Sequence, residues 1–115
     1  MSLICDSFLN ELKEKGEFVQ YLQPIHDTRD SFYKKAKIYS YNNYIYLISY
    51  ETIVAYIEDC KNEGVFATIL GYYSQTTSRH INEFLKQNGF KSLKKKDFEN
   101  TELILLKKGD NLVCN

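Results

Sequence analysis

This 115-residue chain lacks several features that mark specialised proteins. It has no tryptophan and only one proline, and its 15 basic and 15 acidic side chains leave no net charge. A neutral chain creates no overall field that would concentrate nucleic acid or an anionic membrane, so binding of either would have to be local. No internal repeat, linker or low-complexity segment interrupts the sequence.

Cysteine is scarce as well. Cys5, Cys60 and Cys114 are odd in number and far apart, and no Cys-x-x-Cys pair is present. This pattern predicts reduced thiols rather than a zinc or redox motif. The sequence also has no run of about 18 apolar residues, and its first residues do not have the pattern of a signal peptide. We therefore expect a cytoplasmic protein with no membrane partner, no cofactor and no metal.

The residues that are present have the proportions of a globular protein. Hydrophobic residues make up 43% and charged residues 26% of the chain, which argues against extensive disorder. We expect one domain, residues 1–115, that buries roughly two thirds of its unfolded surface. Ten tyrosines and seven phenylalanines suit half-buried strands or a binding surface, and we favour strands.

Apolar residues at helical spacing predict two helices. The first spans about residues 2–15 and ends at Gly16. The second spans about residues 76–88 and ends at Gly89. The expected core face of the second helix consists of Thr77, Ile81, Phe84 and Leu85, and its expected solvent face of Arg79, Glu83 and Lys86.

Segments rich in Tyr, Ile, Val and Thr predict strands at 36–41, 44–50, 52–58 and 64–70, with a further strand or two after residue 100. Asn42-Asn43 is a plausible two-residue hairpin turn, and Gly109-Asp110-Asn111 a final turn. A helix over 52–62 is the rival interpretation of the third segment. Residues 17–23 fit either a helical turn or a strand, which Pro24 ends. The expected fold is α+β, with a mostly antiparallel meander of about four to six strands, an N-terminal helix and a helix near 75–88.

The helix start is the first candidate site, with Ser74, Thr76, Thr77, Arg79 and His80 as its residues. One hydroxyl is enough for an N-cap, so the surplus hydroxyls, the helix dipole and Arg79 resemble a corner that binds an anion. The alternative is structural. The hydroxyls then build the helix start, Arg79 pairs with Glu83 four residues later, and His80 packs as a hydrogen-bonded residue rather than a general base.

Two further groups of residues carry chemistry. His26, Asp27 and Asp30 resemble metal ligands, although three polar residues after a proline are more typical of a loop. Basic residues dominate the segment 79–96, where only Glu83 opposes Arg79, Lys86, Lys91, Lys94, Lys95 and Lys96. A recognition helix followed by a wing would use them to bind DNA, but no positioning helix precedes residue 71. The alternative is a solvated basic hairpin.

Two stretches, "YSYNNYIYLISYETIVAYIE" and "GYYSQTTSRHINEFLKQNGF", resemble a family of small proteins of unknown function from phages, plasmids and related low-GC bacteria. Its members have an SY-x-T-x-(V/I)-A strand, a second strand, and an S-x-T-T-x-(K/R)-H helix start. The matching segments here are Ser49–Ala55 and Ser74–Leu85, and the resemblance covers roughly residues 36–90. It implies a strand–strand–helix unit in which Ser74 and Thr76 cap the helix and His80 joins helix to sheet. It identifies no catalytic residue.

We therefore expect a non-enzymatic accessory protein of a phage or mobile element that binds a host protein or ribonucleoprotein stoichiometrically. Inhibition of a host defence system, in the manner of an anti-CRISPR protein, is one form of this hypothesis. A nucleic-acid-binding regulator that uses helix 75–88 and segment 91–96 is the first alternative. A binder of a small anionic ligand at residues 74–79 is the second, and a homodimer is also left open.

Overall fold

The computed structural model describes residues 6–70, 74–99, 103–108, 113 and 114. Its helices and strands, in chain order, are α1 (Asp6–Lys15), β1 (Glu17–Tyr21), β2 (Ala36–Tyr41), β3 (Tyr44–Ser49), β4 (Thr52–Cys60), β5 (Gly64–Ile69), α2 (Gln75–Gln87), α3 (Lys95–Glu99), β6 (Ile104–Lys107) and β7 (Val113–Cys114). Residues 2–5 of the predicted helix 2–15 and the predicted turn at 109–111 lie outside the described residues.

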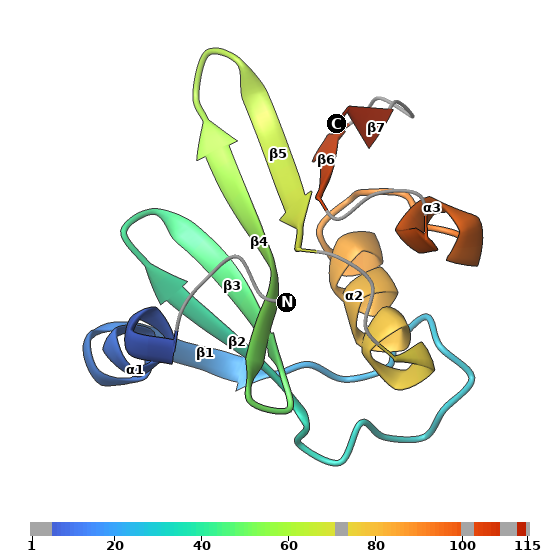
Figure 1. The fold of residues 1–115 in the computed structure, drawn as a ribbon, viewed down its shortest axis with the longest axis horizontal. Coiled ribbons are helices and arrows are strands. Elements are labelled where there is room, and N and C mark those ends of the chain that lie inside the picture. The colour runs from blue at the N-terminus through green and yellow to red at the C-terminus, as the bar shows by residue number, and fades with distance from the viewer. Residues whose placement is uncertain (1–5, 71–73, 100–102, 109–112, 115) are drawn as a thin grey trace.

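The strands form one sheet in the order β1-β2-β3-β4-β5-β6-β7, and each neighbouring pair is antiparallel (Figure 1). The prediction of an α+β fold with an antiparallel meander is confirmed. β6 and the two-residue β7 are the strands expected after residue 100, and β1 adds a seventh strand. The hairpin turn is also where the sequence predicted it, since Asn42 and Asn43 have φ of 50° and 70°. Asparagine tolerates this left-handed conformation better than most residues.

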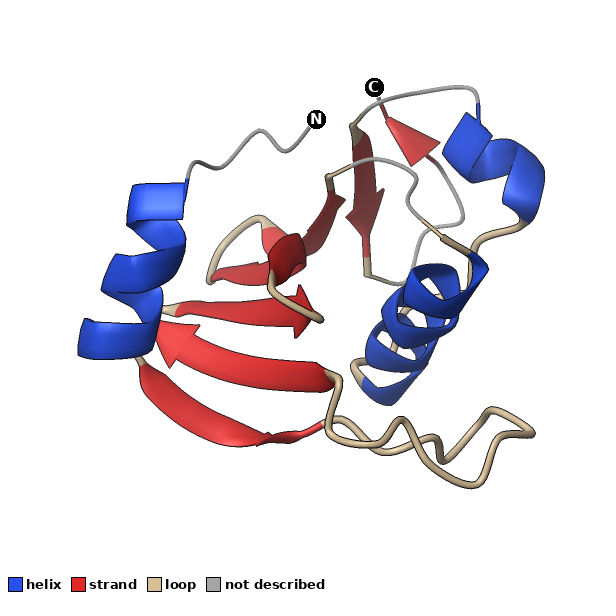
Figure 2. Cartoon of the chain, turned by 60° about the horizontal axis from the view of Figure 1, so that its bottom comes forward, coloured by secondary structure: helices blue, strands red, loops and turns tan. Residues whose placement is uncertain are grey.

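The two long helices lie on opposite sides of the sheet (Figure 2). On one side, Ile81, Phe84 and Leu85 of α2 are fully buried against residues of β2 to β6. Full burial of such a side chain contributes roughly 1.5–3 kcal/mol. On the other side, Leu12 of α1 is buried against Ile48, in a smaller core that includes several strand residues. The sheet is therefore the middle of three layers.

The tyrosines confirm the preference for strands. Half-buried or buried rings of β2, β3 and β4 pack on the α1 side of the sheet, and they comprise Tyr39, Tyr41, Tyr44, Tyr46 and Tyr56. Among their hydroxyls, that of Tyr44 donates a hydrogen bond to the Glu58 carboxylate over 2.7 Å. That hydrogen bond to a carboxylate raises the pKa of Tyr44 to about 12. Tyrosine suits such positions because its ring is apolar and its tip is polar.

Three sequence-based alternatives are decided by the fold. Residues 17–21 form a strand, and the rival helix over 52–62 is wrong because those residues belong to β4. The basic segment is not a hairpin: after Leu93 the chain forms the short helix α3, in which Asp97 accepts a hydrogen bond from Lys94 N over 2.9 Å. An acidic side chain that returns to the first turn stabilises a helix start.

Candidate functional site

Helix α2 begins where the sequence predicted, and Ser74 is its N-cap. Ser74 has an extended backbone (φ −107°, ψ 170°), and its Oγ accepts a hydrogen bond from Thr77 N over 3.1 Å. The capping prediction is confirmed for Ser74 but is wrong for Thr76, which lies inside the first turn and lines a pocket instead. At the other end, Gly89 has φ of +87°, which explains why glycine ends the helix.

A chain of side-chain hydrogen bonds connects this helix start to β3. Ser74 Oγ donates to Thr77 Oγ1 over 3.2 Å. Thr77 Oγ1 lies 3.0 Å from Ser49 Oγ, which in turn lies 2.8 Å from His80 Nδ1. Each hydroxyl has one hydrogen and two lone pairs, so two arrangements satisfy the chain. Either Ser49 donates to Nδ1 and the ring hydrogen is on Nε2, or Nδ1 donates to Ser49 and Ser49 donates to Thr77.

His80 is buried and uncharged. Burial and, to a smaller extent, the positive charge of Arg29 lower its pKa to about 4, against the opposite effect of Asp27. The ring packs edge-on against Phe32, with 4.6 Å between ring centroids. The interpretation of His80 as a hydrogen-bonded residue that joins helix and sheet is confirmed, since Ser49 belongs to β3.

A second set of contacts fastens the β1–β2 loop, residues 22–35, to the side of α2. Arg79 Nη1 lies 2.7 Å from Asp27 Oδ1. Burial acts to raise the pKa of Asp27, but the backbone N–H of Arg29 and the Arg79 guanidinium outweigh it, and the pKa is lowered. The prediction that Arg79 pairs with Glu83 is therefore wrong. Arg79 holds a loop that is 52 residues earlier in the chain.

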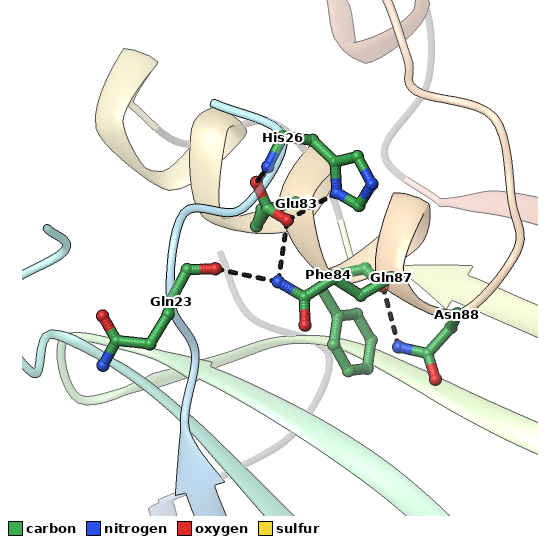
Figure 3. Close-up of polar contacts among 6 residues, drawn as sticks. All are labelled: Gln23, His26, Glu83, Phe84, Gln87 and Asn88. Carbon is green, nitrogen blue, oxygen red and sulfur yellow. Dashed lines mark hydrogen bonds and ion pairs between the residues drawn. The ribbon is translucent and has the colours of Figure 1, made fainter. Parts of the chain in front are cut away.

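Glu83 belongs to the same set of contacts. The helical wheel had placed it on the solvent face, but the residue is buried. It is 2% exposed and accepts hydrogen bonds from the backbone N of His26 (2.7 Å) and from Gln87 (2.7 Å). His26 Nδ1 lies 2.8 Å from Glu83 Oε2 (Figure 3). Gln87 also donates to the backbone O of Gln23. Burial acts to raise the pKa of Glu83, but the contacts with Gln87 and His26 lower it. We call the Arg79–Asp27 and Glu83–His26 contacts the latch.

A pocket of about 260 Å³ lies between the β1–β2 loop, the β3–β4 turn and the first turns of α2. Its lining residues are Arg29, Ser31, Phe32, Tyr33, Lys35, Tyr50, Thr76 and His80. The lining contains two basic side chains and no acidic one. Three non-glycine residues at this place have a left-handed backbone, namely Tyr33 (φ 53°), Lys34 (φ 61°) and Tyr50 (φ 59°). Such conformations are uncommon for bulky residues and cluster at binding sites.

The exposed large apolar side chains come from a few segments of the chain, and two of them, Tyr33 and Tyr50, line the pocket. Every one found among the described residues is in β1, the β1–β2 loop or the β3–β4 turn, and the set consists of Phe18, Val19, Tyr21, Ile25, Tyr33 and Tyr50. We call this set the apolar rim. Lys34 connects its parts, since Lys34 Nζ lies 5.6 Å from the ring centroid of Tyr21 and is the chain neighbour of Tyr33.

The basic candidates lie elsewhere. Lys86, Lys91, Lys94, Lys95 and Lys96 are all exposed. Lys95 lines a second pocket, of about 290 Å³, together with Gln75, Ser78 and Asn82 on a different side of α2 from Thr76 and His80. Asn82 holds the segment there through two hydrogen bonds with the backbone of Leu93, of 3.0 and 2.7 Å. The structure thus separates the sequence candidates into a helix-start group and a lysine group.

The proposed metal ligands do not converge. Among the described residues, no group of three or more His, Cys, Asp or Glu side chains is placed to hold a metal ion. His26 and Asp27 instead bind Glu83 and Arg79, as part of the latch. The loop interpretation of this segment is therefore confirmed. No helix in the described part of the chain has the length and apolar character needed to cross a membrane.

Sequence reasoning missed the residues that complete the pocket. Arg29, Lys35 and Tyr50 are far from α2 in sequence, and no periodic pattern links them to it. The burial of Glu83 was missed for the same reason, because the loop that covers it has no regular structure. One signal was available: residues 29–35 contain three basic and two aromatic residues in a loop, and loops often carry binding residues.

Fold and site together define a small α+β protein in which helix α2 packs on a meander sheet and holds the β1–β2 loop through the latch. The model of the Family of unknown function (DUF8033) matches residues 21–100, which is more than half of the chain. The chain therefore belongs to this family. Comparison with curated proteins and with solved structures finds no match. The matched segment contains the β1–β2 loop, the latch and the whole pocket.

Proposed function

We propose that this chain is a non-enzymatic protein of a phage or mobile element that works by stoichiometric contact with a host protein, for example a component of a defence system. The observation that supports this proposal is the apolar rim. Exposed Phe18, Val19 and Ile25 (44%, 52% and 71% exposed) gather in one stretch of the chain. Clustered exposed apolar side chains are typical of protein-binding surfaces.

The edge of the sheet adds a second reason. β1 is first in the strand order, so one of its sides has no neighbouring strand among the described residues. Its pairing with β2 shifts register between Phe18 and Gln20, which makes Val19 the extra residue of a β-bulge. Bulges protect edge strands against uncontrolled strand addition. The proposed partner therefore contacts the rim through side chains rather than by extending the sheet.

The site also favours binding over catalysis. His80 is the one buried histidine among the described residues, and its Nδ1 is occupied by Ser49. Ser49 is itself 2% exposed and does not line the pocket. A nucleophile has to reach its substrate, and a general base needs a pKa near the working pH. The His80 pKa of about 4 is far below neutral pH, so the ring is poorly suited to act as a general acid or a general base there.

The test compares two sets of substitutions in affinity capture from host cells, followed by calorimetry with the purified partner. The first variant carries Phe18→Ser, Val19→Thr and Ile25→Ser. The control carries Lys94→Ser and Lys96→Ser, which also change exposed side chains but leave the apolar rim intact. We expect a saturable complex of fixed stoichiometry that the rim variant weakens at least tenfold and the lysine variant leaves intact. Turnover of nucleotide or nucleic acid by the purified protein, lost in His80→Ala, would show that the proposal is wrong.

A second candidate function is nucleic-acid binding through the lysine group, supported by the exposure of Lys91, Lys94 and Lys96 on and before α3. Binding to phosphates weakens steeply with salt, and each lysine removed lowers the salt slope by about 1. We expect the Lys94→Ser, Lys96→Ser variant to lower that slope by about 2 if this function is real. The absence of any DNA or RNA binding at low salt would remove this candidate.

A further inference from the structure

We propose that the pocket between the β1–β2 loop and α2 binds a nucleotide, with the phosphate at the two basic side chains and the base between the aromatic ones. This is a small-ligand site, and it stands whether or not the apolar rim binds a host protein. The lining combines the two kinds of group that a nucleotide requires, cationic side chains and flat aromatic surfaces.

The basic side chains are free to bind a phosphate. Arg29 and Lys35 are exposed, and neither forms an ion pair among the described residues. Asp30 follows Arg29 in the chain but is not among the lining residues. Asp27, two residues before Arg29, is already paired with Arg79 at 2.7 Å. The latch therefore engages one of the two nearby carboxylates, and the described lining has two basic side chains and no acidic one. Arginine is well suited to such a site because it donates two parallel hydrogen bonds to a phosphate.

Aromatic side chains supply the walls. Phe32, Tyr33 and Tyr50 line the pocket, and the Tyr50 ring lies 5.9 Å from the His80 ring, centroid to centroid. Bases stack favourably on such rings in nucleic-acid-binding proteins, whatever their sequence. The volume of about 260 Å³ is slightly below the usual range for drug-sized ligands, which begins at about 300 Å³. It therefore fits a mononucleotide unit rather than a dinucleotide cofactor.

Uncharged polar groups complete the site. His80 lines the pocket as a neutral ring whose Nδ1 is hydrogen-bonded to Ser49 over 2.8 Å. Thr76 and Ser31 add hydroxyl groups to the same lining. Neutral donors of this kind orient a phosphate or a base edge without adding a charge that would have to be desolvated.

Backbone hydrogen bonds hold the segments around the pocket in place before any ligand binds. Tyr33 and Tyr50 both have positive φ, and their segments are joined by the hydrogen bond from Tyr50 N to Lys35 O, of 2.7 Å. Lys35 N in turn donates to Phe32 O over 2.9 Å. A left-handed backbone is unfavourable for non-glycine residues, and such strain concentrates where a protein arranges a ligand site. A preformed loop also lowers the entropy lost on binding.

The experiment titrates the full chain with each of the four nucleoside 5′-monophosphates, and separately with the nucleosides and with inorganic phosphate, using calorimetry and amide chemical shifts. We expect at least one monophosphate to bind at least tenfold more tightly than its nucleoside or inorganic phosphate. The Arg29→Gln, Lys35→Gln variant should lose at least tenfold in affinity, while a Lys94→Gln, Lys96→Gln control keeps it. Both variants change exposed side chains, so an unchanged melting temperature shows that the fold is intact.

A 5′-phosphorylated oligonucleotide distinguishes the two sources of the ligand. Tighter binding of the oligonucleotide than of the mononucleotide, lost in Arg29→Gln, Lys35→Gln, supports this site with a nucleic-acid end as ligand. Tighter binding of the mononucleotide supports a free nucleotide. The proposal is overturned if no monophosphate binds at millimolar concentration, or if the Arg29→Gln, Lys35→Gln variant binds as the unchanged protein does.

Discussion

Lowering the pH from 7 to 5 should destabilise this protein through one residue, His80. Its pKa is about 4 in the folded protein against a reference value of 6.5, because the ring is buried beside Phe32 and faces the positive charge of Arg29. A base whose pKa is lowered by folding contributes stability above its unfolded pKa, and that stability is lost as the pH falls towards the folded pKa. The loss therefore lies between pH 6.5 and pH 4.

The expected size follows from the same two values. At pH 5 the unfolded histidine is almost fully protonated, whereas the folded one is still mostly neutral. Linkage then lowers the free energy of unfolding by about 2 kcal/mol relative to pH 7. The carboxyls of Asp27 and Glu83 also have lowered pKa values, but their reference values of 3.8 and 4.5 place most of their effect below pH 5.

Urea denaturation of the unchanged protein and of His80→Asn at both pH values measures this contribution, with circular dichroism as the signal. Asparagine keeps an acceptor near the position of Nδ1, so Ser49 retains a partner while the titrating ring is removed. We expect the variant to be less stable at pH 7 but to lose about 2 kcal/mol less on going to pH 5. Ile53→Val is the control, since Ile53 lies in the smaller core on the other side of the sheet; it lowers stability without changing His80 and should keep the full loss. Equal pH dependence of the unchanged protein and His80→Asn would refute the reasoning.

Three further substitutions test the rest of the arrangement. Ser49→Ala removes the partner of His80 Nδ1 and should lower the free energy of unfolding by about 1–3 kcal/mol in urea denaturation, against almost no change for an exposed serine such as Ser92→Ala. Glu83→Ala should release the β1–β2 loop, seen as faster hydrogen exchange at the His26 amide, and unchanged exchange there would contradict the latch. Asn43→Gly should raise the melting temperature, because φ is 70° at this position and glycine adopts it without strain; a lower melting temperature would count against the assigned turn.

The strands and helices were largely predictable because local patterns determine them. The Asn42-Asn43 turn and the glycine after α2 are sequence signals with a direct conformational cause, and both are where they were expected. β1 was ambiguous because five residues with a bulge have no clean period of two. α3 was missed because its five residues are too few to show helical periodicity, and a run of lysines suggested a solvated turn.

The candidate site was predictable only in part, because its other half comes from non-local contacts. The sequence placed Ser74 and His80 correctly, since capping and helical position are local properties. It assigned Arg79 to the wrong partner, because the i,i+4 rule treats a helix as if it stood alone. The true partner, Asp27, lies in a loop whose path depends on the packing of the whole sheet.

The surroundings of α2 also constrain how the protein contacts nucleic acid, if it does so. The sheet covers one side of the helix, the β1–β2 loop covers a second through the latch, and residue Leu93 is fixed to a third by Asn82. Within α2, only Gln75 and Lys86 are fully exposed. A recognition helix needs a continuous free face to enter the major groove, because several side chains must reach the base edges. α2 offers no such face, so any contact with nucleic acid would involve phosphates at the lysines of residues 91–96 or a single nucleotide in the pocket, and not the reading of a duplex sequence.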